Sequence, residues 1–357
     1  MSHKRPIRLV AVFCLLLPLL LAACGDAPSP APAAATTAAG SATTAAAASA
    51  TTAAAASGTK YKIALVLGSS TDSFYTSMQC GAQEEARKLG DVDLTVQGAQ
   101  TWDATLQIPI INALIANKVQ ALAVVVNDPK ALFAPLKTAS DAGVKVMGVD
   151  TKLDDTSFEV TNISSDNKAL GVVAAKTMAG LINDKGAVAL PALPPGVSTV
   201  SDRITGFREE MKANHPNITL VELASTSTGS NEADGTVAAI NAAFVAHSDL
   251  VGIYATNSTI SDATVAALKG LPADKQQSVK VVGFDATPTS VAAMQAGKVQ
   301  ALVAQKPAQM GALAVDNARK ALMGQQVDKV IPVDGVGLTA QNVTDPNFSQ
   351  YVYKSSC

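Results

Sequence analysis

Short apolar runs alternate with longer amphipathic stretches from Lys60 onward. The short runs are rich in Val, Ile, Leu and Ala and predict strands, whereas the longer stretches predict helices. In the stretch 74–89, for example, Met78, Ala82 and Ala86 fall on one face of a helix. This alternation is typical of an α/β fold with parallel sheets. The predicted strands are 62–67, 93–97, 121–126, 145–149, 187–190, 219–223, 250–254, 279–284 and 301–304.

The order of predicted elements occurs twice along the chain. Residues 60–97 read strand, loop, helix and strand, and residues 185–223 repeat that order. We therefore expect two similar lobes, each with a doubly wound parallel sheet, joined by a hinge of several segments. Because ligands bind outside the carboxyl ends of the strands in such sheets, the cleft between the lobes is the expected binding site for a small molecule.

The N-terminus carries the pattern of an export signal. A short basic stretch precedes an apolar run at 9–21, which is followed by small residues and Cys24. The sequence Leu-Ala-Ala-Cys at 21–24 resembles the bacterial lipobox, whose cysteine is modified with lipid. We expect residues 1–23 to be removed and Cys24 to anchor the protein to a membrane outside the cytoplasm. The alternative is an ordinary cleavage site beside a cysteine.

Residues 24–59 form a segment of low complexity. It consists almost entirely of Ala, Thr, Ser, Pro and Gly, with no charge after Asp26 and no large apolar side chain before Lys60. Such a composition cannot form a core, and a flexible chain of this length spans roughly 30 Å. The interpretation is a linker at 24–59 that carries a globular part at 60–357.

Charge and composition narrow the classes of protein. Loss of Lys4, Arg5 and Arg8 with the signal would change the net charge from -2 to -2 - 3 = -5. A mildly acidic protein without a block of basic residues argues against nucleic acid as a partner. Hydrophobic residues make up 48% of the chain, which is enough for a substantial core.

Two cysteines remain after the signal is removed and Cys24 is lipidated. Cys80 and Cys357 are then available, and an oxidising compartment permits a disulfide between them. The alternative is that Cys80 is a small buried helix residue and Cys357 a free terminal thiol. The sequence leaves both interpretations open.

Motifs for catalysis are missing from the sequence. His3, His215 and His247 are isolated, so their spacing predicts no metal site. The chain also lacks the signatures of zinc proteases, P-loops, nucleophile elbows and dinucleotide sites. We therefore expect a protein that is not an enzyme and needs no cofactor or metal, although a catalytic triad assembled from distant residues stays open.

Polar residues follow many of the predicted strands. Carboxylate and amide groups at such positions can each bind two adjacent hydroxyls of a ligand. Aromatic residues fall in or beside the same loops, where a ring can cover the apolar face of a sugar. For each polar residue alone, a helix N-cap is the alternative interpretation. The polar residues are Asp72, Gln100, Asn127, Asp150, Asn257, Asp285 and Gln305, and the aromatic residues are Phe74, Tyr75 and Trp102.

Four segments resemble a known family. They are 73–90, 165–167, 202–207 and 281–288, in this order and spacing. The chain from Lys60 to about Gly337 resembles periplasmic sugar-binding proteins of the ribose-binding type, the solute-binding components of ABC importers. The segment 281–288, with the sequence Val-Val-Gly-Phe-Asp-Ala-Thr-Pro, is the most specific of the four.

The resemblance implies roles for individual residues. Asp72 stands where the family usually has a ligand-binding Asn, and Thr151 stands where it often has an Arg. The loss of that Arg removes a fork of five donors and argues against ribose itself. By the same resemblance, stacking is assigned to Phe74 and Tyr75, and hydroxyl binding to Asn127, Asp150, Arg203, Asn257, Asp285 and Gln305.

The resemblance also implies a mechanism of hinge closure. Crossing segments are expected near Asn162, Gln305 and Asp334, which divide the globular part into lobe one at about 60–161 and 306–333 and lobe two at about 162–305 and 334–357. A ligand would bridge both lobes and stabilise the closed form. The closed form, expected to be a monomer, would then dock on an importer permease.

The expected function is capture of a small sugar or polyol for an ABC importer. One alternative is a lipid-anchored sensor that presents its ligand, such as a furanosyl autoinducer, to a membrane signalling partner. Another is a secreted α/β hydrolase. The three differ in their partners and in whether the ligand is turned over.

Overall fold

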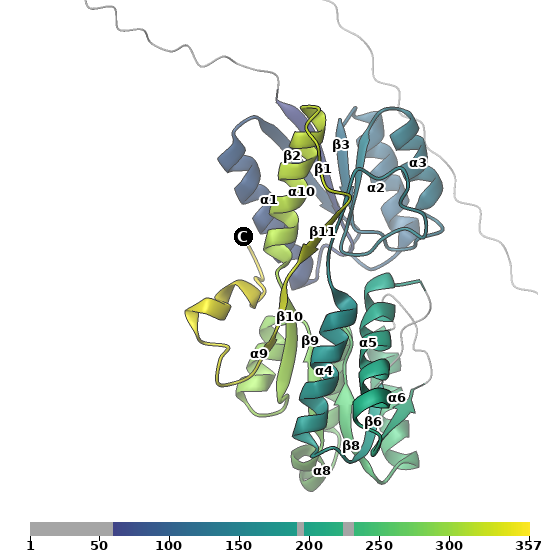
Figure 1. The fold of residues 1–357 in the computed structure, drawn as a ribbon, viewed down its shortest axis with the longest axis vertical. Coiled ribbons are helices and arrows are strands. Elements are labelled where there is room, and N and C mark those ends of the chain that lie inside the picture. Colours follow the sequence, from purple (N-terminus) through teal and green to yellow (C-terminus); the bar gives the residue numbers. More distant parts are fainter. Residues whose placement is uncertain (1–59, 191–195, 224–231) are drawn as a thin grey trace, which may run out of the picture. The chain divides into compact units, whose positions relative to one another are not determined.

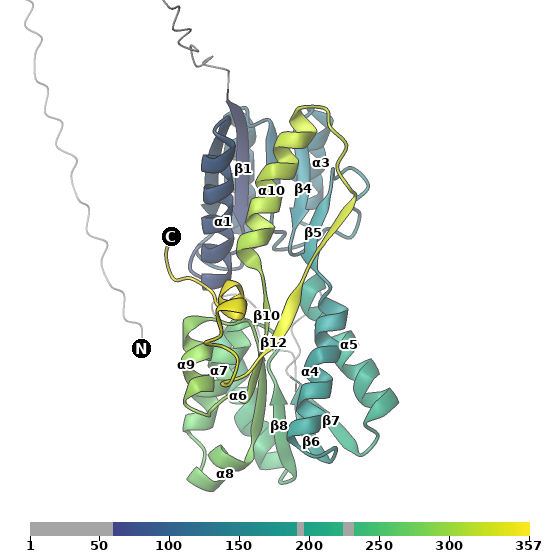
Figure 2. The same ribbon diagram turned by 60° about the vertical axis from the view of Figure 1, so that its left-hand side comes forward.

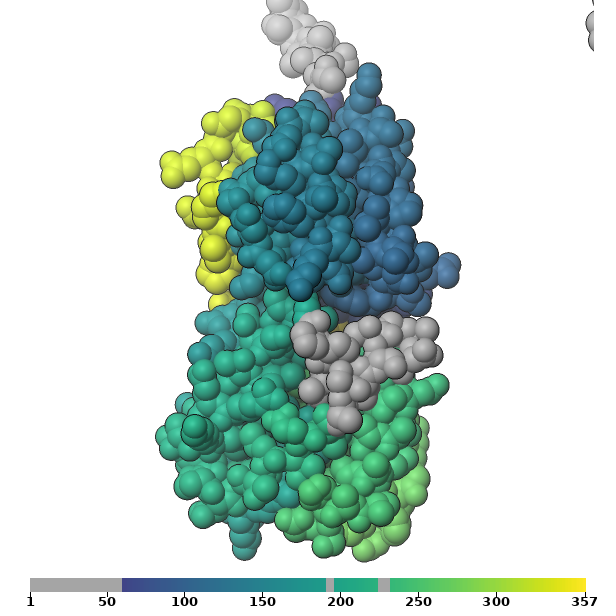
Figure 3. Space-filling model, turned by 90° about the vertical axis from the view of Figure 1, so that its right-hand side faces the viewer, coloured from purple at the N-terminus to yellow at the C-terminus, as the bar shows by residue number. Residues whose placement is uncertain are grey.

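The computed structural model describes residues 60–190, 196–223 and 232–357. These residues form two lobes, each built around a six-stranded sheet with flanking helices (Figure 1). Figure 3 shows the blue and teal residues of lobe one and the green residues of lobe two meeting on one face. The predicted α/β fold with two doubly wound lobes is confirmed.

Lobe one contains a sheet whose paired strands all run parallel. Its apolar strands are buried because helices cover both faces, as parallel sheets require. The strand order is β11-β5-β4-β3-β1-β2. The strands are β1 (Tyr61–Leu67), β2 (Val92–Gly98), β3 (Ala121–Val124), β4 (Lys145–Val149), β5 (Asn162–Ser165) and β11 (Val330–Val333), and the helices are α1 (Ser73–Leu89), α2 (Ala104–Ala116), α3 (Phe133–Asp141) and α10 (Pro307–Leu322).

Lobe two repeats this arrangement with one antiparallel edge. The strand order is β12-β10-β9-β8-β6-β7, and only β12 runs antiparallel to its neighbour. The strands are β6 (Gly186–Leu190), β7 (Ile218–Glu222), β8 (Leu250–Tyr254), β9 (Lys280–Phe284), β10 (Ala301–Gln305) and β12 (Gly335–Leu338). The helices are α4 (Asn167–Leu181), α5 (Ser198–Asn214), α6 (Glu232–Ala246), α7 (Ser258–Lys269), α8 (Ala273–Ser278) and α9 (Pro288–Gln295).

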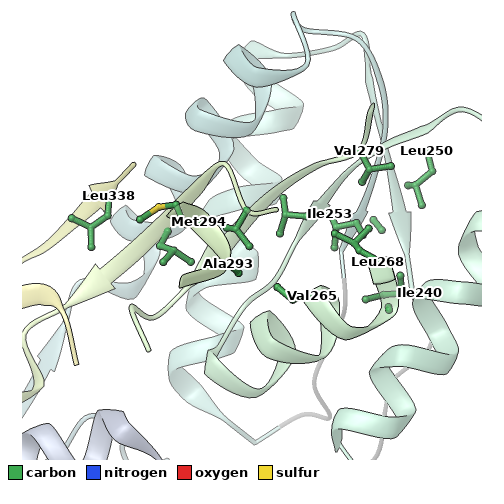
Figure 4. Close-up of a cluster of buried hydrophobic side chains, with 14 of the residues drawn as sticks. Ile240, Leu250, Ile253, Val265, Leu268, Val279, Ala293, Met294 and Leu338 are labelled. Carbon is green, nitrogen blue, oxygen red and sulfur yellow. The ribbon is translucent and has the colours of Figure 1, made fainter. Parts of the chain in front are cut away.

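Each sheet separates two apolar clusters. In lobe two, one cluster joins β8 and β9 to α6, α7 and α9 through residues such as Ile253, Val265 and Met294 (Figure 4). The other lies under α4 and α5 and contains Phe207 stacked on Tyr254, with ring centroids 4.3 Å apart. These clusters fix the sheets rigidly, so the strand ends are held in defined positions.

Close helix pairs cover one face of each sheet. A Cβ atom on Gly81 of α1 would lie 1.9 Å from the Ala308 carbonyl oxygen of α10. A Cβ atom on Gly206 of α5 would likewise lie 2.0 Å from the Lys168 carbonyl oxygen of α4. Both lobes therefore use glycine to bring two helices together, since any side chain there would separate them.

The chain crosses between the lobes at three places. One crossing follows β5, one follows β10, and one lies between β11 and β12. Figure 2 shows α10 above β10 and β5 above α4. The chain passes from β10 of lobe two to α10 of lobe one after Gln305, and from β11 of lobe one to β12 of lobe two at Asp334. The lobe boundary expected at Asn162 is wrong by one strand, because β5 pairs with β4 and β11 in the sheet of lobe one. The sequence analysis did not predict β5 because its four residues, Asn-Ile-Ser-Ser, are mostly polar.

The C-terminal tail also contacts both lobes. A 3-10 helix, η2 (Pro346–Tyr351), packs on lobe two, where Tyr351 joins the core. Tyr353 then enters the core of lobe one, and a disulfide links Cys357 to Cys80 on α1, with Cα atoms 5.3 Å apart. The expected boundary, which assigned residues 334–357 to lobe two, is therefore wrong for the end of the tail.

The nine predicted strands correspond to strands of the structure, with ends displaced by no more than two residues. Three strands were missed, namely β5, β11 and β12, and each has four residues. Pro332 interrupts β11, and β12 contains two glycines, so their local patterns do not favour a strand.

Several sequence predictions lie outside the described residues. They are the signal peptide at 1–23, the lipidation of Cys24 and the linker at 24–59. In the ranges that the structure describes, no helix is long and apolar enough to span a bilayer.

Candidate functional site

A cavity of about 100 Å³ lies between the lobes, at the carboxyl ends of their strands. A buried water molecule needs roughly 10–15 Å³, so the cavity has room for a small organic molecule. Residues of both lobes line it: Asp72, Phe74, Tyr75, Trp102 and Asp150 of lobe one, and Val197, Thr199, Val200, Arg203, Glu232, Asn257, Ser258, Thr259, Asp285 and Gln305 of lobe two.

The loop after β1 supplies an aromatic wall. Asp72 caps α1 by accepting a hydrogen bond from the Phe74 backbone N–H at 2.8 Å, which places Phe74 and Tyr75 in the first turn. The Tyr75 ring stacks on Trp102 with centroids 6.2 Å apart. Gly68 permits this packing, because a Cβ atom there would lie 2.5 Å from the Trp102 ring. The wall offers flat apolar surface to a ligand.

Asp150 lies directly after β4, in the left-handed region with a φ of 64°. The Tyr75 hydroxyl donates to its Oδ2 at 3.2 Å, while no described residue bonds to its buried Oδ1. Burial raises the pKa of Asp150 to about 7, although the Arg203 guanidinium opposes the shift. A ligand hydroxyl facing Oδ1 would satisfy this acceptor.

Arg203 extends from α5 into the cavity and is held by three contacts. Its Nε donates to Asn167 Oδ1 at 2.8 Å, and its Nη1 donates to the Thr256 carbonyl oxygen at 2.9 Å. The guanidinium carbon lies 3.7 Å from the centre of the Phe284 ring. These contacts fix the orientation of the planar fork before any ligand arrives.

Asp285 is the centre of a hydrogen-bond network in lobe two. It follows β9 with a φ of 71°, and its Oδ1 accepts from Gln305 Nε2 at 2.9 Å and from the Tyr353 hydroxyl at 2.7 Å. Its Oδ2 accepts from the Ser258 backbone N–H at 3.1 Å. Gln305 Oε1 is buried without a partner among the described residues, so it is available to a donor of the ligand.

Asn257 and Glu232 form a second polar pair. The Asn257 Oδ1 caps α7 by accepting from the Ile260 backbone N–H at 2.8 Å, and its Nδ2 donates to Glu232 Oε1 at 3.1 Å. Burial raises the pKa of Glu232, and the nearby charge of Asp72 acts in the same direction. Asn257 is therefore both a helix cap and a wall of the cavity.

Direct contacts join the lobes at the rim of the cavity. The Ser258 hydroxyl of lobe two donates to Asp72 Oδ2 of lobe one at 2.6 Å. The Lys152 backbone N–H of lobe one donates to the Ser198 hydroxyl of lobe two at 3.2 Å. The described residues thus adopt an arrangement in which the lobes touch around the site.

Asn127 is a predicted ligand residue that does not line the cavity. Its Nδ2 donates to the Gly68 carbonyl oxygen at 2.9 Å, and its backbone N–H donates to Gln107 Oε1 at 3.1 Å. The side chain therefore joins the loops after β1 and β3 and supports the aromatic wall. Gln100, also predicted from its strand-end position, lines a neighbouring groove.

The sequence prediction missed several lining residues. Ser258 and Thr259 directly follow Asn257, so their proximity could have been inferred. Glu232 follows no strand directly, and its position depends on how α6 packs. The start of α5, one to two turns before Arg203, supplies the other missed residues, Val197, Thr199 and Val200. No sequence pattern at these positions indicates ligand binding.

The described residues contain no group of three His, Cys, Asp or Glu side chains placed to hold a metal ion. The cavity instead combines hydrogen-bonding groups with aromatic rings. This arrangement suits a ligand that carries several hydroxyls on an apolar frame and binds without a metal ion.

Comparisons with known proteins identify the family of this chain. Residues 63–326 match the family described as "Periplasmic binding protein domain". The chain is 31% identical over 275 residues to the ribose import binding protein of Escherichia coli (strain K12), covering 77% of this chain and 89% of that protein. It is 28% identical to the ribose import binding protein of Bacillus subtilis (strain 168), covering 76% and 85%.

A solved structure shows the same fold. The ABC transporter solute-binding protein from Agrobacterium vitis, bound with alpha-D-tagatopyranose, is 33% identical and superimposes with a TM-score of 0.77. The match covers 83% of this chain and 100% of that one.

The fold and the comparisons define a sugar-binding solute receptor of an ABC transporter, and the relatives named above are binding proteins. Within that class, the chain belongs to the periplasmic binding protein domain family and is of the ribose-binding type. The family resemblance noted in the sequence is thereby confirmed.

Proposed function

We propose that the protein captures a small sugar or polyol between its lobes and delivers it to an ABC-type importer permease. The observation that carries the proposal is the convergence on one small cavity of aromatic rings from lobe one and polar groups from both lobes. The relatives named above as ribose import binding proteins support import as the process.

Binding would proceed by closure of the lobes around the ligand. Asp150 Oδ1 and Gln305 Oε1 are buried acceptors without partners among the described residues, one in each lobe. A ligand that donates to both stabilises the arrangement in which the lobes touch, because each unsatisfied buried acceptor costs about 1–3 kcal/mol. A sugar that lacks either hydroxyl would bind more weakly, which gives stereochemical selectivity.

We also propose that lipid on Cys24 holds the receptor at the outer face of the cytoplasmic membrane. The order of basic residues, apolar run and Leu-Ala-Ala-Cys supports this location, as does the extracytoplasmic character of the family. In labelled cells, the protein should incorporate fatty acid and sediment with membranes. The Cys24→Ala variant should do neither, and continued labelling of that variant would contradict the proposal.

A thermal-shift screen against pentoses, hexoses and polyols tests the binding function. A ligand that binds only the native state raises the melting temperature in a concentration-dependent way. Hits should be confirmed by calorimetry with a dissociation constant below about 10 µM, which corresponds to roughly 7 kcal/mol. If no sugar or polyol shifts the melting temperature at millimolar concentration, the proposal fails.

The signalling alternative stays a prediction. Uptake of a radiolabelled hit ligand into cells separates it from import, because a sensor would leave the ligand outside. Loss of uptake on deletion of this protein is the outcome expected for an importer component.

A further inference from the structure

The cavity carries an excess of negative charge. Four of its lining residues are carboxylates, Asp72, Asp150, Glu232 and Asp285, and Arg203 is the single basic residue among the described residues that line it. The formal sum is -4 + 1 = -3. The two gaps within the described globular part, 191–195 and 224–231, contain no charged residue in the sequence.

This charge is not arranged to hold a metal ion. The part of the chain that the structure describes has no cluster of three His, Cys, Asp or Glu side chains in ligating positions. Only Asp150 and Asp285 correspond to acidic positions that the family resemblance assigns, whereas Asp72 replaces an Asn and Thr151 replaces an Arg. Glu232 adds a further carboxylate.

The groups of the cavity that await a partner are acceptors. Asp150 Oδ1 and Gln305 Oε1 are both buried and unpaired among the described residues, with side chains only 5% and 1% exposed. A neutral hydroxyl offers one hydrogen to such acceptors, whereas a protonated amine offers three and also carries a positive charge. The buried acceptors therefore call for donors on the ligand, and a carboxylate of the cavity can take either a hydroxyl or an ammonium group, of which only the ammonium also offsets its charge.

Asp72 and Glu232 mark the position for such a group. Both line the cavity and also the groove that adjoins it, and the charge of Asp72 acts on Glu232. Burial raises the pKa of both carboxyl groups, which is the response expected when buried negative charge has no counter-charge. A ligand cation between them would remove that cost.

On this basis, and resting on the proposed capture of a sugar or polyol, we propose that the site takes an amino sugar or aminopolyol whose protonated amine lies between Asp72 and Glu232. The hydroxyls of this ligand would face Asp150, Arg203, Asp285 and Gln305. The aromatic wall would cover its apolar face.

Calorimetry with matched pairs tests the proposal on the purified protein. The pairs are D-glucosamine with D-glucose, D-galactosamine with D-galactose, and 1-amino-1-deoxy-D-sorbitol with D-sorbitol. The N-acetylated amino sugars serve as a third member in which the charge is absent. In at least one pair, we expect the amine to bind ten or more times as tightly as the neutral member and the N-acetylated form.

Two variants locate the amine. Asp72→Asn keeps a residue that can cap α1, and Glu232→Gln keeps the shape of the side chain. Each should reduce the ratio of amine to neutral affinity at least tenfold. Glu209→Gln removes an exposed carboxylate from the same lobe as Glu232 and should leave the ratio unchanged.

Three outcomes overturn the inference. If the neutral member binds as tightly as the amine in every pair, the cavity does not select a positive charge. Only the proposed capture of a sugar or polyol then stands. If both variants keep the ratio, the amine does not lie between Asp72 and Glu232. If neither amines nor neutral members bind, the proposed function itself fails together with the inference.

Discussion

Asp72 is at once the N-cap of α1 and a wall of the cavity. Asn257 has the same double role at the start of α7. Capping and ligand binding were alternative interpretations of these residues, but the observed cap does not exclude ligand binding, because a carboxylate or amide has more than one atom that can form hydrogen bonds. The helix cap uses one oxygen and leaves the other polar atom for a second partner, which is the Ser258 hydroxyl for Asp72 and the Glu232 carboxylate for Asn257.

Asp285→Asn tests the network in lobe two. Three donors converge on the Asp285 carboxylate, from Gln305, Tyr353 and the Ser258 backbone. Asn tolerates the left-handed backbone but replaces one acceptor oxygen by a donor, so the network must rearrange. We expect the affinity for the best ligand of the screen to fall about 100-fold, or roughly 2.7 kcal/mol, by calorimetry. Asp249→Asn, at an exposed site before β8, is the control, and an equal loss there would contradict the prediction.

Glu159 introduces a pH dependence of stability away from the cavity. Burial raises the pKa of Glu159 from 4.5 to about 7, opposed in part by Asn162 and by the charge of Lys329. The fold favours the protonated form. The contribution of protonated Glu159 to the unfolding free energy is therefore complete below pH 4.5 and is lost as the pH rises through 7.

Glu159→Gln should remove that dependence. The amide stays neutral, so ionisation at this position no longer destabilises the variant as the pH rises. The difference in unfolding free energy, variant minus native protein, should therefore increase by about 1–3 kcal/mol from pH 5 to pH 8. Urea unfolding at the two pH values measures it. Glu84→Gln, an exposed residue of lobe one, should show no such change, and a gain independent of pH for Glu159→Gln would argue against the titration.

At the scale of elements, paired helices set the positions of the functional loops. The α4–α5 pair carries Arg203, and its close approach depends on Gly206. Because α5 is held against the sheet of lobe two by Phe207 and Met211, a displacement of α5 would move Arg203 relative to the strand ends. Packing of helices and geometry of the site are thus coupled.

Gly206→Ala should be destabilising for this reason. Its Cβ atom would lie 2.0 Å from the Lys168 carbonyl oxygen, so the two helices must separate. We expect the unfolding free energy to fall by about 2–3 kcal/mol in urea. Gly180→Ala on α4 is the matched control, because its Cβ atom meets nothing within 4 Å, and it should stabilise the protein by about 0.5–1 kcal/mol. Equal effects of the two changes would refute the packing argument.

At the scale of the whole molecule, the C-terminal tail connects the lobes with the ligand site. Tyr353 packs among the apolar residues of lobe one, and its hydroxyl donates to Asp285 of lobe two. The disulfide between Cys357 and Cys80 holds the end of the tail on α1 across a sequence separation of 277. The tail therefore adds a fourth connection to the three crossings of the hinge.

The double variant Cys80→Ser, Cys357→Ser tests the contribution of this connection. Without the crosslink, the unfolded chain gains freedom, and the unfolding free energy should fall by about 2–4 kcal/mol in urea. Ligand affinity should fall as well, because Tyr353 is less firmly held against Asp285. A reducing agent should reproduce both effects in the native protein and have none on the variant. Unchanged stability of the variant would show that the tail is held by packing alone.

Local patterns in the sequence determined the alternation of strands and helices, the two lobes and most of the polar residues at the strand ends. Strands with consecutive or alternating apolar residues and helices with one apolar face are recognisable without distant contacts. The loops at the carboxyl ends of parallel strands fall on one edge of each sheet by topology, so Asp72 and Asp150 could be placed together in lobe one, and Asp285 and Gln305 in lobe two, from the sequence.

Only the tertiary structure decided the features that depend on contacts between distant residues. The short strands β5, β11 and β12 exist because neighbouring strands supply their hydrogen bonds. Asn127 points to Gly68 and not to the cavity, and Glu232 reaches the cavity through the placement of α6. Such positions are fixed by packing and hydrogen bonding across the fold, and no local pattern records them. The net negative charge of the cavity likewise became visible only when these side chains were assembled.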